Sequence, residues 1–147
     1  MSKNHGPSKI LSLVESTRAL RDPIRRAARL AKLATQVEPG QAEAVFVAAL
    51  EEIARIRDPW LRDAARGFVV DAHVGLGQYA QALALASRME SAYQRALCYA
   101  EVRHAVRSDV DKTLANSADA GFVLAREQLD SDSRADLERA VRLIEED

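Results

Sequence analysis

A short sequence that begins with Arg-Asp-Pro occurs twice, and this repetition constrains the fold more than any other feature. It reads RDPIRRAAR over residues 21–29 and RDPWLRDAAR over residues 57–66. In each copy the aspartate can cap a helix and the proline can occupy its first position, so each copy predicts a helix start. A more degenerate third copy follows at an offset of 32 residues, which matches Val70 with Val102. A unit of roughly 32–37 residues suits a helix–turn–helix repeat, and such units stack because one alone cannot bury its apolar face.

The composition favours helices along the whole chain. Alanine, the best helix former, occurs 27 times, whereas the 147 residues include only four prolines and six glycines. We therefore predict an all-α fold, a stack of antiparallel helix pairs (a short α-solenoid) with about eight or nine helices. We expect one domain over residues 8–147, after a disordered segment at residues 1–7. The predicted helices are 8–20, 22–36, 41–56, 58–76, 78–89, 92–106, 108–116, 119–129 and 133–146.

Two serines give helix-start signals in the last third of the chain. Ser108 is followed by Asp111, and Ser133 by Asp136, at the spacing of a capping box. The helical pattern weakens over Asn116–Gly121. We therefore predict two short helices around that stretch, with one kinked helix as the alternative.

Charge is unevenly distributed along a chain whose net charge is only −1. Residues 1–36 contain eight basic and two acidic side chains, and residues 109–147 contain five basic and eleven acidic ones. These ends are either solvated helix faces or surfaces that attract each other or an oppositely charged partner. The longest apolar run, residues 45–50, is far shorter than a membrane span, and we find no signal-peptide pattern. We therefore expect a cytoplasmic protein that does not associate with membranes.

The sequence contains no recognisable catalytic, phosphate-binding or metal-binding motif. The single cysteine, Cys98, lies in a helical pattern and is expected to be an inert, partly buried thiol. The three histidines have no zinc-ligand spacing, and neither a GxxxxGK[ST] nor a GxGxxG motif occurs. The adjacent carboxylates Glu51 and Glu52 do not face each other on a helix, and we expect both at the solvated surface. We therefore predict no enzymatic activity, no cofactor and no metal.

The segment Gly77-Gln78-Tyr79-Ala80-Gln81-Ala82-Leu83 resembles the tetratricopeptide-like α-solenoid repeats. In that family a glycine ends the first helix, an aromatic residue opens the second, and a small residue three positions later lets the two helices cross closely. Gly77, Tyr79 and Ala82 match these roles, whereas Arg66 stands where the family has a large aromatic residue. The resemblance implies a curved stack of helix pairs of the kind that binds other proteins.

The same resemblance implies a binding groove lined by the first helix of each pair. At the 32-residue offset Asp71 corresponds to Arg103, and Gly67 corresponds to Tyr99. An Asp71–Arg103 pair beside Tyr99 could clamp a peptide through charge-assisted contacts, or it could be an ordinary salt bridge between repeats. Trp60 follows a cap and a proline, so it either packs against the helix start or stays exposed as an anchor.

A basic stripe crosses the first two predicted helices. Its members are Arg18, Arg21, Arg25, Arg26, Arg29 and Lys32. Nucleic-acid binding through this stripe is disfavoured, because the sequence pI is about 6.3, no aromatic residues are interleaved, and the acidic end would repel phosphates. We expect a non-catalytic module that binds a protein or peptide. The alternative is a homo-oligomer joined through the basic and acidic ends.

Overall fold

The computed structural model describes residues 7–106 and 112–146. Within those residues the chain forms eight α-helices and no β-strand, which confirms the all-α prediction. The helices are α1 (Pro7–Arg18), α2 (Pro23–Ala34), α3 (Pro39–Ala54), α4 (Pro59–Gly75), α5 (Tyr79–Ser87), α6 (Ala92–Val106), α7 (Lys112–Glu127) and α8 (Ser131–Glu146).

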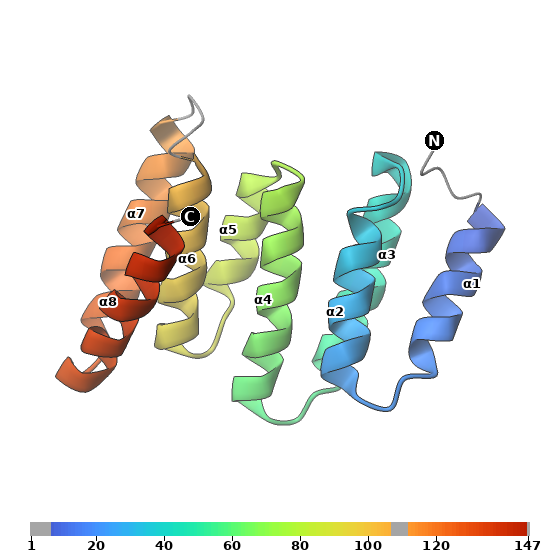
Figure 1. Ribbon diagram of the computed structural model, residues 1–147, viewed down its shortest axis with the longest axis horizontal. Helices are drawn as coiled ribbons and strands as arrows, with labels where there is room; N and C mark the ends of the chain where they lie inside the picture. The colour runs from blue at the N-terminus through green and yellow to red at the C-terminus, as the bar shows by residue number, and fades with distance from the viewer. Residues whose placement is uncertain (1–6, 107–111, 147) are drawn as a thin grey trace.

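Consecutive helices run in opposite directions and form two rows (Figure 1). In one row α2 packs against α4, α4 against α6, and α6 against α8. The other row covers one side of the first, because α3 packs on α2, α5 on α4, and α7 on α6. Helix α1 lies at one edge of the array, against α2 and α3, and α8 lies at the opposite edge (Figure 1).

The two Asp-Pro sequences begin α2 and α4, as predicted. The backbone N–H of Ile24 donates to Asp22 Oδ1 at 2.9 Å, and that of Trp60 donates to Asp58 Oδ1 at 2.8 Å. In both helices a proline follows the cap, where its missing N–H costs no hydrogen bond. A cap of this kind stabilises a helix by about 1 kcal/mol.

The next two helices of this row also begin at a capping side chain. The backbone N–H of Gln94 donates to Ser91 Oγ at 3.3 Å at the start of α6. The backbone N–H of Ser133 donates to Asp130 Oδ1 at 2.7 Å at the start of α8. The prediction that Ser133 caps the last helix is therefore wrong, because Asp130 takes that role and the helix begins two residues before Ser133.

An arginine lies four residues after each of these caps, and we call this set the interhelix arginines: Arg26, Arg62, Arg95 and Arg134. In the first three, Nη1 donates to the carbonyl oxygens six and five residues earlier, just after the end of the preceding helix. For Arg62 the acceptors are Ile56 O at 2.8 Å and Arg57 O at 3.3 Å. Arg134 donates in the same way to the last turn of α7. Since the carbonyls at a helix end lack partners within the helix, each arginine fastens one helix start to the helix end before it.

The same arginines also reach forward along the chain. The pairs are Arg26 with Glu52 at 2.9 Å, Arg62 with Glu90 at 2.6 Å, and Arg95 with Gln128. Glu52 is only 4% exposed, so its prediction as a solvated surface residue is wrong. A buried carboxylate needs a paired charge, and the Arg26 guanidinium supplies it.

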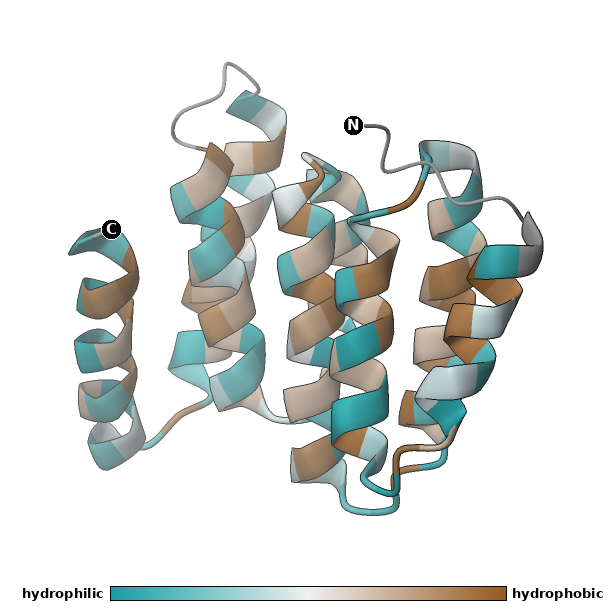
Figure 2. Ribbon diagram, turned by 45° about the vertical axis from the view of Figure 1, so that its right-hand side comes forward, coloured by the Kyte–Doolittle hydropathy of each residue, from teal (hydrophilic) through white to brown (hydrophobic). Residues whose placement is uncertain are grey.

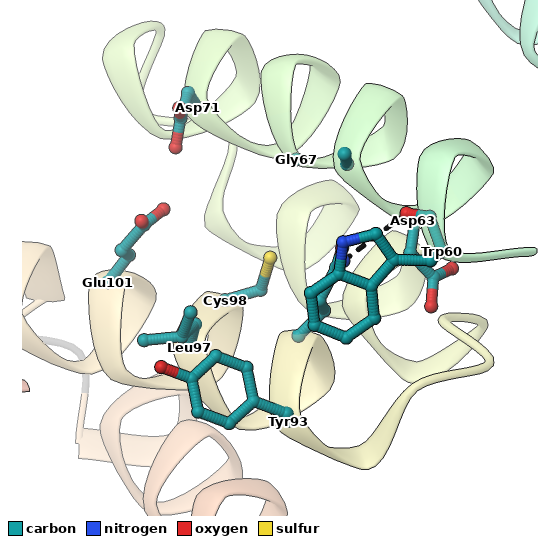
Figure 3. A pocket seen from close by; sticks show the side chains of 10 residues that line it. Trp60, Asp63, Gly67, Asp71, Tyr93, Leu97, Cys98 and Glu101 are labelled. Carbon is teal, nitrogen blue, oxygen red and sulfur yellow. Dashed lines mark hydrogen bonds between the residues drawn. The ribbon is translucent and has the colours of Figure 1, made fainter. Parts of the chain in front are cut away.

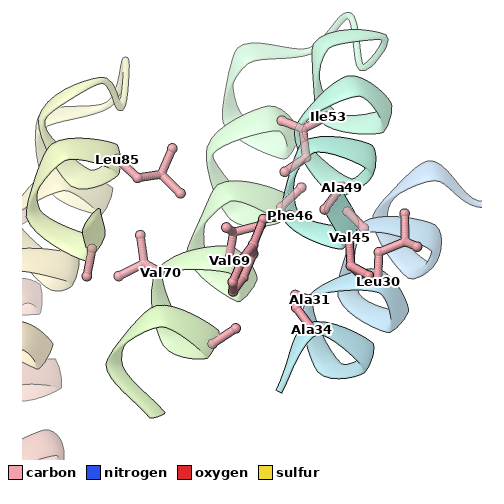
Figure 4. Packing of buried hydrophobic residues seen from close by; sticks show 14 of the residues in the cluster. Leu30, Ala31, Ala34, Val45, Phe46, Ala49, Ile53, Val69, Val70 and Leu85 are labelled. Atoms are coloured by element: carbon pink, nitrogen blue, oxygen red, sulfur yellow. The ribbon is translucent and has the colours of Figure 1, made fainter. Parts of the chain in front are cut away.

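Apolar side chains pack between the helices in two core clusters (Figures 2 and 4). The larger cluster runs from α1 to α6, and its members include Leu30, Val45, Ile53, Val69 and Val102. The smaller cluster joins α6, α7 and α8 through Ala96, Ala100, Phe122, Leu137 and Val141. Alanines such as Ala34, Ala49 and Ala65 are fully buried, because their small side chains let neighbouring helices approach closely.

The turn between α4 and α5 has the predicted form. Gly77 has a φ of +73°, in the left-handed region that glycine adopts without strain. The N–H of Gln78 donates to His73 O at 2.8 Å, and the N–H of Gly77 donates to Val74 O at 3.0 Å. These two bonds satisfy helix-end carbonyls in the Schellman arrangement, so Gly77 ends α4 as expected.

The prediction of two helices around Asn116–Gly121 is wrong, because α7 is one helix across this stretch. Gly121 does not break the helix. A Cβ atom there would lie 2.5 Å from Cε1 of Tyr99, so the glycine lets α6 and α7 pack closely. Ser108, the expected cap, and residues 1–6 of the segment predicted to be disordered lie outside the described residues. Pro7 already belongs to α1.

Candidate functional site

A groove of about 200 Å³ lies between α4 and α6, and we call it the α4–α6 groove (Figure 3). Its lining residues are Trp60, Asp63, Ala64, Gly67, Asp71, Tyr93, Gln94, Leu97, Cys98 and Glu101. On α4 the residues Trp60, Ala64, Gly67 and Asp71 follow the spacing of one helix face, and on α6 so do Tyr93, Leu97 and Glu101. The groove is therefore the space between two facing helix stripes.

An aromatic pair forms one end of the groove. The rings of Trp60 and Tyr93 stack with their centroids 6.3 Å apart. The backbone of Trp60 is also held from α6, because Gln94 Nε2 donates to Trp60 O at 3.2 Å. The Trp60 side chain nevertheless remains 54% exposed, so the structure favours the exposed alternative for this residue.

Asp63 lies at the base of the aromatic end and is fully buried. Its Oδ1 accepts hydrogen bonds from Arg66 Nη1 at 2.8 Å and from the N–H of Glu90 at 3.1 Å. Its Oδ2 accepts a bond from the N–H of Ser91 at 2.6 Å. These bonds fix the segment before α6 against α4. Asp63 therefore positions the two walls of the groove.

Two carboxyl groups form the other end of the groove. The side chains of Asp71 on α4 and Glu101 on α6 point toward each other and share a hydrogen bond (Figure 3). Partial burial, that hydrogen bond and the Asp71 charge together raise the pKa of Glu101 to about 9. At neutral pH the pair therefore holds one proton, on Glu101.

Cys98 lines the wall of the groove but has little reactivity. Its side chain is buried, and its thiol donates to the sulfur of Met89 at 3.5 Å. Burial, followed by the nearby carboxyl groups of Glu101, Asp71 and Asp63, raises the pKa of this thiol far above its ordinary value. The attacking form of cysteine is the thiolate, so the expectation of an inert thiol agrees with these surroundings.

The predicted clamp of Asp71 with Arg103 beside Tyr99 is wrong. Arg103 faces α7 and α8, where Nη1 lies 3.1 Å from Asp119 Oδ1 and the guanidinium lies 4.2 Å from the centroid of the Phe122 ring. Arg103 Nη2 also lies 3.6 Å from a carboxylate oxygen of α8. Tyr99 packs against Gly121 on α7. Of the four predicted partner-binding residues, the groove therefore contains Trp60 and Asp71.

The physical reason is an error of one residue in the repeat offset. Aligning the caps Asp58 and Ser91 gives 33 residues rather than 32, and this offset pairs Trp60 with Tyr93 across the groove. One residue turns a helix by about 100°. The shift therefore moved the predicted α6 side chains to the opposite face. It also hid Glu101, which the correct cap alignment would have placed beside Asp71.

The predicted basic stripe is not one continuous surface. Arg26 turns into the fold toward Glu52, and Arg18 pairs with Glu15 at 3.7 Å on α1. Arg29 and Lys32 line a separate hollow between α1 and α2. The side chains of Arg21 and Arg25 are exposed. The stripe is therefore divided among an internal ion pair, a local pair on α1 and solvated side chains.

The described part of the chain offers no group of three or more histidine, cysteine, aspartate or glutamate side chains placed to hold a metal ion. None of its helices combines the length and apolar character needed to cross a membrane. Comparison with known protein families, curated proteins and solved structures finds no match to this chain.

Proposed function

We propose that this chain is a non-catalytic interaction module, a short tetratricopeptide-like α-solenoid that binds a segment of another protein in the α4–α6 groove. The helix pairs and their turn support the repeat assignment. Ala82 is fully buried where α5 crosses α4, and Tyr79 packs against the same core. These are the positions that carry the resemblance in the sequence.

The observation that carries the proposal is the state of Trp60. A tryptophan that is half exposed and also stacked presents a large apolar surface with little conformational entropy left to lose on binding. Aromatic residues of this kind are common at the centres of protein interfaces.

The size and chemistry of the groove favour a protein segment over a cofactor or substrate. Sites for drug-sized ligands usually enclose about 300–1,000 Å³, which is more than the volume of about 200 Å³ here. Nucleophilic catalysis needs an activated group beside a base. The only thiol of the groove is buried and held in its protonated form.

Selection from a random heptapeptide phage library tests this function. We expect the wild-type chain to enrich a family of peptides, and Trp60→Ala to lose them while its circular dichroism stays unchanged. Leu143→Ala is the matched control, because Leu143 is 68% exposed on α8, away from the groove. Failure to enrich any peptide, or equal binding to Trp60→Ala, would refute the proposal.

Self-association is the second candidate, and a specific surface favours it. An apolar groove of about 430 Å³ lies between α1 and α3, beside the exposed side chains of Leu11 and Val47. At the opposite edge Leu124 and Leu143 are more than 60% exposed. Sedimentation velocity across protein and salt concentrations tests this candidate. A monomeric mass at every concentration would exclude it.

A further inference from the structure

The lining of the α4–α6 groove has one sign of charge. Within the described residues its ionisable side chains include the carboxyl groups of Asp63, Asp71 and Glu101 but no lysine, arginine or histidine. Asp63 is balanced by the Arg66 guanidinium at 2.8 Å. The uncompensated negative charge therefore lies at the end formed by Asp71 and Glu101.

The middle of the groove is open. A Cβ atom added at Gly67 would have no heavy atom beyond its own helix and chain neighbours within 4 Å. Gly67 precedes Asp71 by one helical turn on the same face, and Leu97 lies opposite on α6. The aliphatic stem of a long side chain can lie over this floor while its charged end reaches the carboxyl pair.

The two ends of the groove are separated by a distance that a short peptide can span. Trp60 and Asp71 are eleven residues apart on α4, or about 16 Å at 1.5 Å per residue. An extended chain covers that distance in about five residues. One peptide can therefore contact the aromatic pair with an apolar residue and the carboxyl pair with a residue further along.

We infer that the α4–α6 groove binds an extended segment that sets an apolar side chain against Trp60 and a lysine or arginine side chain against Asp71 and Glu101. This inference rests on the proposed function and names the chemistry of the partner. The cation takes the place of the proton that Asp71 and Glu101 now share. It converts a costly pair of like groups into a charge-assisted contact.

Blocked pentapeptides of sequence acetyl-Leu-Ala-Ala-Xaa-Ala-amide test the inference, with lysine, arginine or citrulline as Xaa. Citrulline has nearly the shape of arginine but no charge. Binding is followed by NMR, through the backbone amide of Gly67 and the indole N–H of Trp60, the only tryptophan of the chain. We expect the lysine and arginine peptides to bind about tenfold more tightly than the citrulline peptide.

Two variants give the expected result its meaning. Asp71→Asn combined with Glu101→Gln should abolish the advantage of the cationic peptides. Glu43→Gln combined with Asp132→Asn neutralises two exposed carboxylates away from the groove and should preserve that advantage. Gly67→Leu should weaken every peptide, because its side chain fills the open floor without meeting a neighbour.

The outcomes separate this inference from the proposed function. If phage-selected peptides bind in a Trp60-dependent way, but arginine and citrulline peptides bind equally, the cationic partner is wrong and the interaction module stands. If only the lysine peptide or only the arginine peptide gains affinity, the inference holds for that side chain. If no peptide shifts the Gly67 and Trp60 signals and the phage selection also fails, both proposals fall.

Discussion

Arg26 and Glu52, which are 26 residues apart in the sequence, form an ion pair of 2.9 Å between α2 and α3. The Glu52 side chain is 6% exposed, and the same guanidinium also donates to the carbonyl oxygens of Leu20 and Arg21. A single arginine thus joins the end of α1, the start of α2 and the last turns of α3. The basic residue that the sequence suggested as part of a binding stripe has a structural role instead.

Arg26→Ala should destabilise the chain by about 3 kcal/mol, because it leaves the buried Glu52 carboxylate with only the largely exposed Arg55 as a partner. Urea unfolding followed by circular dichroism measures the change. Arg25→Ala is the control, since the Arg25 side chain is exposed, and it should change stability by no more than about 0.5 kcal/mol. Equal stability of the two variants would contradict the structural role of Arg26.

Asp63→Ala should cost about 3 kcal/mol, because three donors that converge on this buried carboxylate lose their acceptor. Glu43→Ala removes an exposed carboxylate from α3 and should leave stability nearly unchanged. Thermal unfolding of both variants compares them. The Asp63→Ala protein should also show weaker coupling between the Trp60 and Tyr93 rings, visible in near-ultraviolet circular dichroism.

Gly67→Ala and Gly121→Ala should change stability in opposite directions. Both glycines lie in the middle of a helix, so replacement by alanine gains up to about 1 kcal/mol of helix propensity at either site. The new Cβ meets open space at position 67 but lies 2.5–2.7 Å from ring atoms of Tyr99 at position 121. Denaturant unfolding should therefore show a more stable Gly67→Ala protein and a less stable Gly121→Ala protein. A gain in both would mean that the Tyr99 ring moves aside freely.

Stability should fall as the pH rises through the neutral range because of Glu101. Its pKa is about 9 in the folded chain, against a model value of 4.5, so the folded state holds a proton that the unfolded state has released. Below about pH 4.5 both states are protonated and there is no penalty. Between about pH 4.5 and 9 stability falls with pH, by at most about 1.4 kcal/mol per pH unit.

Glu101→Gln removes this titration, so the stability of the variant relative to wild type should rise steadily from pH 6 to pH 9. Chemical denaturation at each pH measures the difference, and Glu43→Gln provides an exposed control. A constant difference between wild type and Glu101→Gln across this range would show that Glu101 is ionised in the folded chain.

The helical architecture could be predicted because it depends on local signals. Asp22-Pro23 and Asp58-Pro59 both combine a side-chain cap with a fixed backbone angle, and Gly77 supplies the positive φ that ends α4. Such signals act within a few residues of chain, and their physical cause does not depend on the rest of the fold. The break predicted near Gly121 failed for the complementary reason. Contact with Tyr99, on another helix, determines the role of that glycine.

The groove could be predicted only in part, because its residues meet across two helices. Trp60 and Asp71 came from one helix and were found, whereas Glu101 depends on the rotation of α6 relative to α4. That rotation follows from the position of the cap, and a serine at position 91 in place of the aspartate of the other starts left the register ambiguous by one residue. The arginine four residues after each cap is the sequence signal that resolves it.

The interhelix arginines have a consequence for how the chain unfolds. In a stack of repeats, stability is roughly a sum of terms between neighbours, so the ends can fray while the middle persists. Here Glu90 accepts from Arg62 through its carboxylate and from Arg95 through its carbonyl, and Arg95 also reaches Gln128. Loss of one helix pair would therefore strand a guanidinium of the next. Melting that begins at one edge has no favourable place to stop, and the whole array should unfold in a single cooperative step.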